Sequence, residues 1–84
     1  MSYKLVYTLR AAKDVERLDS KVKSRIGRVL LRYSENPFEY ARKLTDSKLG
    51  GYRFRIGDYR VIFDIEGDKI IVLRIGHRKD IYRR

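Results

Sequence analysis

The sequence predicts an α+β domain with elements in the order β-α-α-β-β-β, in which a two-helix hairpin packs on one face of a mainly antiparallel, twisted sheet. Apolar spacing changes from two residues to about 3.6 after position 8 and returns to two at position 52. The chain of 84 residues is long enough for one domain, 1–84. It contains no cysteine, so one small hydrophobic core must stabilise it without disulfides.

The first strand and the first helix follow from the opening residues. Residues 1–8 (MSYKLVYT) alternate aromatic or apolar side chains with other residues, which predicts a strand. Thr8 is suited to cap a helix. Ala11, Val15 and Leu18 then recur at i, i+4 and i+7, which predicts a short helix.

A second helix begins near Asp19 or Ser20, either of which can cap it, and ends before Asn36-Pro37. Its apolar stripe consists of Val22, Ile26, Val29, Leu30 and Tyr33. Its basic residues, which fall largely away from that stripe, are Lys21, Lys23, Arg25, Arg28 and Arg32. We interpret them as a solvated helix face, with non-specific RNA contact as the alternative.

The carboxyl-terminal half predicts three strands. Residues 38–50 form a connection, with a helical turn expected through Tyr40, Ala41 and Leu44. The expected strands are residues 52–56, 59–65 and 70–75, with turns at 57–58 and 66–69. The continuous apolar run of the last strand suits a central position in the sheet. Residues 78–84 form a short basic tail.

The segment GYRFRIGDYRVIF sets arginines into a hairpin that otherwise suits a core. A two-residue turn at Gly57-Asp58 places Arg55 directly opposite Arg60, and like charges that face each other destabilise a strand pair. The same register pairs Arg53 with Ile62 and, on the face toward the helices, Ile56 with Tyr59, Phe54 with Val61 and Tyr52 with Phe63. Because guanidinium groups bind phosphate oxygens at two points, we interpret the arginine face as an anion site. The alternative is that the two arginines extend into water and an acid such as Asp64 neutralises one of them.

The last strand brings a further arginine to this site. In an antiparallel pair the end of one strand lies beside the start of the next, so Arg78 is expected near Arg60. The turn around Gly67-Asp68 has either two or three residues, which leaves the face of the last strand open. Tyr82 can return to the same site if the tail forms a helical turn.

The charge of the chain indicates the kind of partner it binds. Lys and Arg number 21 against 11 Asp and Glu, and the resulting net charge of +10 favours a polyanion or an acidic protein. A highly solvated surface is the other interpretation. The opening residues contain no long apolar run, so we expect no secretory signal, no membrane span and a cytoplasmic location.

Two segments, GDYRVIF and IGHRKDIY, resemble in order and spacing the RelE toxins of the RelE/ParE superfamily. The resemblance covers nearly the whole chain, since the order of elements and the length also agree. It implies a toxin of a type II toxin-antitoxin system that enters the vacant decoding site of the ribosome and cuts the mRNA there. It also implies a RelB-like antitoxin, which the charge of this chain predicts to be acidic and partly disordered.

The resemblance also implies site residues. Those that match the residues around the scissile phosphate are Arg53, Arg55, Arg60, Arg78 and Tyr82. The chain departs from some relatives in having arginine rather than lysine at the first two positions. His77, beside Arg78, is present in certain branches, and it is a candidate general base whose role depends on the strand register. Tyr82 can stack on a base or move a proton, although a phenol is a weak base at neutral pH.

The residues favour RNA cleavage without a metal or any other cofactor. One histidine, no cysteine and no carboxylate pair at helical spacing give little from which to build a metal site. The 2′-hydroxyl of RNA can instead attack the neighbouring phosphate, with Arg60 and Arg78 stabilising the charge that develops and Arg53 and Arg55 holding the RNA backbone.

Three other functions are compatible with this scaffold. A ParE-like toxin would inhibit DNA gyrase through protein contacts and would not require the arginines and the tyrosine. A non-catalytic RNA- or DNA-binding module would expose stacking aromatics on its basic face, whereas the hairpin aromatics are predicted on the core side. An inactive descendant that is kept only as the partner of an antitoxin is the third alternative.

Overall fold

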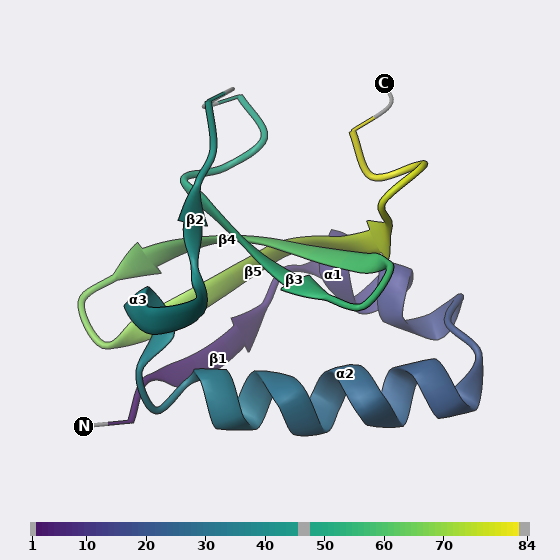
Figure 1. Ribbon diagram of the computed structural model, residues 1–84, viewed down its shortest axis with the longest axis horizontal. Coiled ribbons are helices and arrows are strands. Elements are labelled where there is room, and N and C mark those ends of the chain that lie inside the picture. Colours follow the sequence, from purple (N-terminus) through teal and green to yellow (C-terminus); the bar gives the residue numbers. More distant parts are fainter. Residues whose placement is uncertain (1, 46–47, 83–84) are drawn as a thin grey trace.

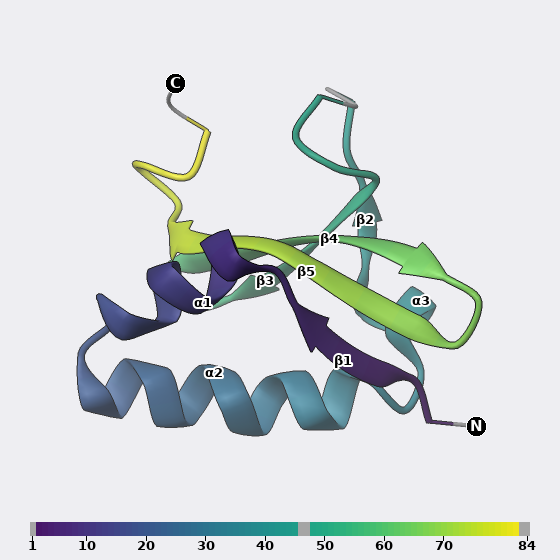
Figure 2. The same ribbon diagram turned by 180° about the vertical axis from the view of Figure 1, so that it is seen from behind.

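The computed structural model describes residues 2–45 and 48–82 and has the predicted α+β architecture (Figure 1). In these residues a five-stranded sheet has the strand order β1-β5-β4-β3-β2, in which β1 is parallel to β5 (Figure 2) and the other neighbours are antiparallel. The elements are β1 (Lys4–Tyr7), α1 (Leu9–Glu16), α2 (Ser20–Tyr33), α3 (Pro37–Tyr40), β2 (Arg42–Lys43), β3 (Tyr52–Ile56), β4 (Tyr59–Glu66) and β5 (Lys69–His77).

Side-chain caps start both of the longer helices at the predicted residues. The Thr8 hydroxyl accepts a hydrogen bond from the Ala11 backbone N–H at 3.1 Å, and the Asp19 carboxylate accepts one from the Lys21 N–H at 3.2 Å. Such caps satisfy backbone donors that have no partner within the helix. Within the described residues no helix is long and apolar enough to cross a membrane.

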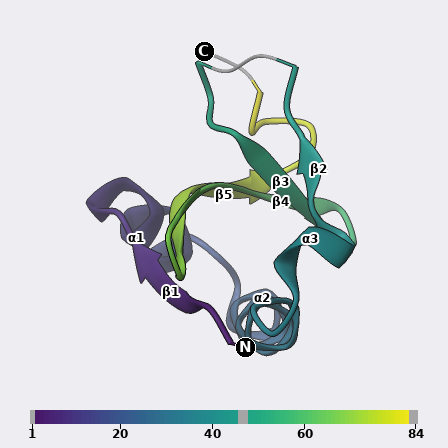
Figure 3. The same ribbon diagram turned by 90° about the vertical axis from the view of Figure 1, so that its left-hand side faces the viewer.

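The hydrophobic core lies between one face of the sheet and the helices α1 and α2. Figure 3 shows the sheet edge-on above α2. The buried residues of this core are Ala11, Ile26, Leu30, Phe54, Ile56, Val61, Phe63, Ile70, Val72 and Ile75. The hairpin register is the predicted one, with Phe54 opposite Val61 and Ile56 opposite Tyr59. This register directs the alternate residues, arginines among them, to the opposite face.

The connection before β3 differs from the prediction. Its helical turn lies earlier, at Pro37–Tyr40, because proline is suited to the first position of a helix and lacks only a donor that would have no partner there. Ala41 has extended backbone angles, and the next two residues form β2, a strand that we did not predict. Strand β2 pairs Arg42 with Arg53 and extends the sheet by one strand.

A β-bulge at Leu73 decides which face the end of β5 presents. The turn at Gly67-Asp68 has two residues. A regular ladder from that turn would place residue 77 on the same face as Arg60. Between Ile62 and Phe63, however, the register shifts by one residue, so that Arg60 pairs with Gly76 and Tyr59 with His77.

The described residues of the tail, 78–82, and of the β2–β3 connection, 44–45 and 48–51, rise on the sheet face away from α2 (Figure 3). Each segment approaches the sheet closely through an almost completely buried isoleucine: a Cβ added at Gly50 would lie 2.8 Å from the Ile62 side chain, and one added at Gly76 would lie 3.1 Å from the Ile81 side chain. The two segments therefore flank the face that carries the arginines.

Candidate nucleic-acid interface

Arg55 and Arg60 occupy directly opposite positions on β3 and β4, as predicted. Arg53 projects from the same face because it lies two residues before Arg55 on the same strand. No ion pair found among residues 2–45 and 48–82 involves any of these three arginines. The sheet face therefore concentrates positive charge that the described part of the protein does not neutralise.

Arg60 is the one buried charged side chain among the described residues, with 9% of its surface exposed. Its Nη1 donates hydrogen bonds to the backbone carbonyl oxygens of Gly57 and Tyr59, each at 2.9 Å, which fixes the guanidinium over the hairpin turn. Burial lowers the pKa of Arg60 from its usual value, and so does the neighbouring Arg55 cation; Arg53 and Arg78 act in the same direction, whereas Tyr82 raises it. A buried cation surrounded by cations is unfavourable unless an anion joins it.

Arg78 reaches the site from the end of β5. Its backbone N–H donates to the Asp58 carbonyl oxygen at 2.7 Å, so the residue is anchored beside the hairpin turn on which Arg60 lies. Its side chain forms an ion pair with the Asp58 carboxylate at 3.6 Å, and the two side chains are 55% and 70% exposed. A pair that long and that exposed contributes little, so the Arg78 guanidinium is available to a stronger anionic ligand.

Tyr82 comes to Arg60 from the tail. A turn after β5, in which the Ile81 N–H donates to the His77 carbonyl oxygen at 2.9 Å, folds the chain back over the sheet. Ile81 packs against Gly76, where an added Cβ would lie 3.1 Å from the Ile81 side chain, so the absence of a side chain lets the tail approach closely. Tyr82 itself is 42% exposed, and its phenol is open to a ligand.

His77 lies on the other face of the sheet. It pairs with Tyr59, and the two rings make an edge-to-face contact with centroids 5.4 Å apart. Its Nδ1 accepts a hydrogen bond from the Lys79 backbone N–H at 3.1 Å. Of the two orientations left open by the sequence, the bulge at Leu73 selects the one that directs His77 away from the arginines.

Sequence reasoning missed two residues at the edge of this face. The two residues are Tyr40 and Arg42, and Arg42 pairs with Arg53. Together with Arg53 and Arg55 they line a hollow of about 340 Å³. One face of the Tyr40 ring stacks on Tyr33, with centroids 4.0 Å apart. No periodic signal marks a strand of two residues, and the sequence offered only an arginine two positions after an aromatic residue, in Tyr40-Ala41-Arg42.

The acids near the site have other partners or lie at turns. The Asp64 carboxylate accepts a hydrogen bond from the Gly51 N–H at 2.6 Å and so holds the β2–β3 connection rather than neutralising an arginine. Among the residues described, no three His, Asp or Glu side chains gather as a metal ion would require. The geometry thus presents cations and a phenol to whatever binds.

Comparison with known proteins gives this arrangement a context. Toxin RelE3 of Methanocaldococcus jannaschii is 30% identical over 83 residues, which cover 94% of each chain. Toxin RelG of Mycobacterium tuberculosis is 28% identical over 87 residues, which cover both chains completely. The solved toxin-antitoxin complex RelBE2 of Mycobacterium tuberculosis has a similar fold, with a TM-score of 0.84 at 22% identity over 93% of this chain and 100% of that one.

The fold and the relatives define a toxin of a type II toxin-antitoxin system. The pattern of the family described as ParE toxin of type II toxin-antitoxin system, parDE, matches residues 5–82, and the chain belongs to this family. Within the RelE/ParE superfamily it is a RelE-type toxin, as its 30% identity with toxin RelE3 over nearly the whole chain indicates. The predicted superfamily is thereby confirmed.

Proposed function

We propose that this toxin is a ribosome-dependent endoribonuclease that cuts mRNA in the decoding site, without a metal ion, and so inhibits translation in the cytoplasm. The observation that carries the proposal is Arg60, which is buried, has no carboxylate partner among the described residues, and lies in the field of three further arginines. A phosphodiester that lost its solvent shell there would gain a strong, prearranged counter-charge.

The proposed reaction is an internal transesterification. The 2′-oxygen of the RNA attacks the adjacent phosphorus, the bond to the 5′-oxygen breaks, and a 2′,3′-cyclic phosphate and a 5′-hydroxyl result. Arg60 stabilises the charge that builds on the phosphorane oxygens, because its two hydrogen bonds to the hairpin turn hold the guanidinium in place before the reaction. Arg78 supplies the second cation from the end of β5.

Proton transfer falls to Tyr82 in this proposal. One proton must leave the 2′-hydroxyl and one must reach the 5′-oxygen. Arg53, Arg55, Arg78 and Tyr82 all influence Arg60 electrostatically. Of these four side chains, only the Tyr82 phenol is suited to give up and regain a proton. His77 lies on the other sheet face beside Tyr59, so we leave it out of the catalytic group.

The RNA strand on either side of the cut needs contacts of its own. Arg53 and Arg55, which we expected to hold the backbone, share their hollow with Arg42 and Tyr40. A guanidinium cluster beside an exposed ring suits a single-stranded nucleotide, whose phosphate and base it contacts together. We therefore extend the proposed RNA path from Arg60 across β3 to β2.

A RelB-like antitoxin is the proposed inhibitor. The solved relative RelBE2 is a toxin-antitoxin complex. The present chain carries a net charge of +10 and exposes Leu31 and Phe38, which suits an acidic polypeptide that folds on binding and buries apolar side chains. Purification from the native operon should yield a small acidic companion, and its absence would count against this part of the proposal.

Inhibition of DNA gyrase is the second candidate, and the family description, which names ParE toxins, favours it. Such an inhibitor would act through protein contacts. It would gain nothing from a buried Arg60 that forms no ion pair within the described residues, which is why we rank it second.

One experiment separates the two. The purified toxin is added to a translating extract, mRNA ends are mapped, and gyrase supercoiling is assayed in parallel, with Arg60→Ala and Arg78→Ala beside the wild type. We expect ribosome-dependent cuts that each variant reduces by about 10²-fold or more, as the loss of a transition-state contact typically does. Intact mRNA together with blocked supercoiling would overturn the proposal in favour of gyrase.

A further inference from the structure

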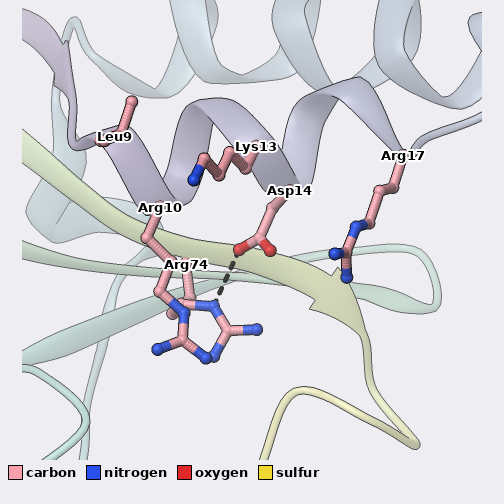
Figure 4. Close-up of a pocket in the computed structure, with 6 residues that line it drawn as sticks. All are labelled: Leu9, Arg10, Lys13, Asp14, Arg17 and Arg74. Carbon is pink, nitrogen blue, oxygen red and sulfur yellow. Dashed lines mark hydrogen bonds and ion pairs between the residues drawn. The ribbon is translucent and has the colours of Figure 1, made fainter.

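A second basic hollow lies between α1 and β5, apart from the arginines of β3 and β4 (Figure 4). Its volume is about 490 Å³, and its lining consists of Leu9, Arg10, Lys13, Asp14, Arg17 and Arg74. Arg10, Lys13 and Arg17 follow one another at i, i+3 and i+7, so one side of α1 presents a row of cations about 10 Å long. We call these three residues the α1 row.

Asp14 is the only acid among the described residues of the lining, and its carboxylate already has hydrogen-bond partners within the protein. The Asp14 Oδ2 accepts hydrogen bonds from Arg74 Nε at 2.8 Å and from the backbone N–H of Ile75 at 2.9 Å, as the dashed line in Figure 4 shows for Arg74. The bond from Ile75 gives a partner to a backbone N–H on the edge of β5, beyond Val72, where the pairing with β1 ends. Asp14 is therefore a structural residue that also orients Arg74. None of the ion pairs in the described ranges involves the α1 row.

We propose that this hollow binds the phosphate backbone of double-stranded RNA. The site is separate from the proposed cutting site, and the inference does not require that the chain cuts RNA. Arg74 pairs in register with Ile62 and so projects from the same sheet face as Arg60. A folded RNA that rests on the α1 row and Arg74 would thus lie at the margin of the face on which a single strand is cut.

The lining residues favour a duplex over a single strand. Binding of single-stranded RNA draws much of its affinity from bases that stack on aromatic rings, and the described residues of this lining include none. Duplex RNA is recognised through its phosphates and 2′-hydroxyls, for which a rigid row of cations is sufficient. The hollow at Tyr40 and Arg42 has the opposite character, since it has an exposed ring.

The same lining disfavours an acidic peptide. A peptide that orders on binding must bury apolar surface to offset the loss of conformational entropy. Leu9 is the single apolar side chain of the hollow, 74% exposed at its rim. Four cations against one committed acid suit a phosphate chain better.

The test compares two variants that each lose three positive charges. Arg10→Gln/Lys13→Gln/Arg17→Gln removes the α1 row. Lys4→Gln/Lys23→Gln/Lys69→Gln removes the same charge from exposed positions that line none of the hollows described for this protein. Binding to a labelled RNA duplex of about 16 base pairs is followed by fluorescence anisotropy at several salt concentrations. We expect the first variant to lose about tenfold or more in affinity and to reduce the slope of log K against log salt by about 2 to 3, and the control to change either value much less.

Each other outcome overturns the inference. Unchanged duplex binding in the α1 variant would show that RNA does not bind in the hollow. Equal losses of affinity in the two variants would show that the duplex is attracted only by the overall positive charge of the protein. Binding of an oligoglutamate peptide that the α1 variant loses, with duplex binding retained, would assign the hollow to an acidic protein. Far-ultraviolet circular dichroism confirms that both variants are folded. Because duplex binding is measured without ribosomes or cleavage, failure of the cleavage proposal would leave this result unchanged.

Discussion

Arg55 and Arg60 face each other across the β3–β4 ladder, and no carboxylate among the described residues forms an ion pair with either. Cross-strand pairs of like charge destabilise a sheet, so the position works against the stability of the fold. An RNA phosphate between the two guanidinium groups would remove that repulsion. The pair is therefore expected to lower the stability of the isolated protein and to strengthen its binding of RNA. Both effects can be measured.

Replacing Arg55 with threonine should stabilise the isolated toxin and weaken its activity. Relief of the repulsion, with a β-branched residue in the strand, is expected to raise the melting temperature by roughly 1 to 6 °C. Loss of a charge-assisted phosphate contact is expected to lower RNA cleavage about tenfold to a hundredfold. Thermal melting and mapping of mRNA ends measure the two effects.

Lys43→Thr is the matched control, because Lys43 pairs with Tyr52 and has no cation opposite it. It should change neither the melting temperature nor cleavage appreciably. A lower melting temperature for Arg55→Thr would show that the two arginines do not repel each other in the folded protein.

His77→Gln should leave cleavage nearly intact. The imidazole contacts Tyr59 on the face away from the arginines, so its removal is expected to cost far less than the ~10²-fold that loss of a general acid or base causes. The pH profile of cleavage should keep its shape. Arg78→Gln, one position further on, should by contrast reduce cleavage strongly. A His77→Gln toxin that binds ribosomes but has lost cleavage would return His77 to the catalytic group.

Tyr82→Phe should retain ribosome binding and lose cleavage, since it removes only the hydroxyl that we assign to proton transfer. The expected loss is about 10²-fold. Tyr82→Ala removes the ring as well and should also weaken RNA binding. If Tyr82→Phe cuts as fast as the wild type while Tyr82→Ala does not, the residue acts by stacking and another group moves the protons.

The fold was predictable because local patterns and packing agree along most of the chain. Alternation fixed the strands, caps at Thr8 and Asp19 marked both helices, and the two-residue turn at Gly57-Asp58 was enough to set the hairpin register. When local conformational preferences agree with the packing of the whole fold, the fold can be predicted from the sequence.

The features that could not be predicted depend on contacts between distant residues. The bulge at Leu73 inserts one residue without any local signal, and the face of Arg78 and His77 depends on it. Strand β2 exists because Arg42 and Lys43 find β3 as a partner, not because two residues favour a strand. The sequence therefore predicted that Arg55 and Arg60 lie opposite each other, but it gave no sign of Arg42 beside Arg53 and left the face of His77 open.

Two glycine-to-alanine changes should shift stability in opposite directions. Gly27 lies within α2 with no atom within 4 Å of an added Cβ, so Gly27→Ala should stabilise the fold by about 0.5 to 1 kcal/mol. Gly50 has a φ of +154°, and its Cβ would lie 2.8 Å from Ile62 and 2.9 Å from Leu73. Gly50→Ala should therefore destabilise by about 1 to 3 kcal/mol. Urea unfolding measures both, and equal effects would contradict the packing described for the β2–β3 connection.

Arg42→Gln tests whether the RNA path extends to β2. Arg42 projects toward the hollow with Arg53 and Arg55, whereas its neighbour Lys43 pairs with Tyr52 and belongs to the other face. If Arg42 contacts a phosphate of single-stranded RNA, its loss should reduce the slope of log K against log salt by about 0.7, irrespective of RNA sequence. Lys43→Gln removes the same charge one residue away and should leave the slope unchanged. If both variants have the same slope, Arg42 affects RNA binding only through its long-range charge and makes no direct phosphate contact. The proposed RNA path would then reach β3 but not β2.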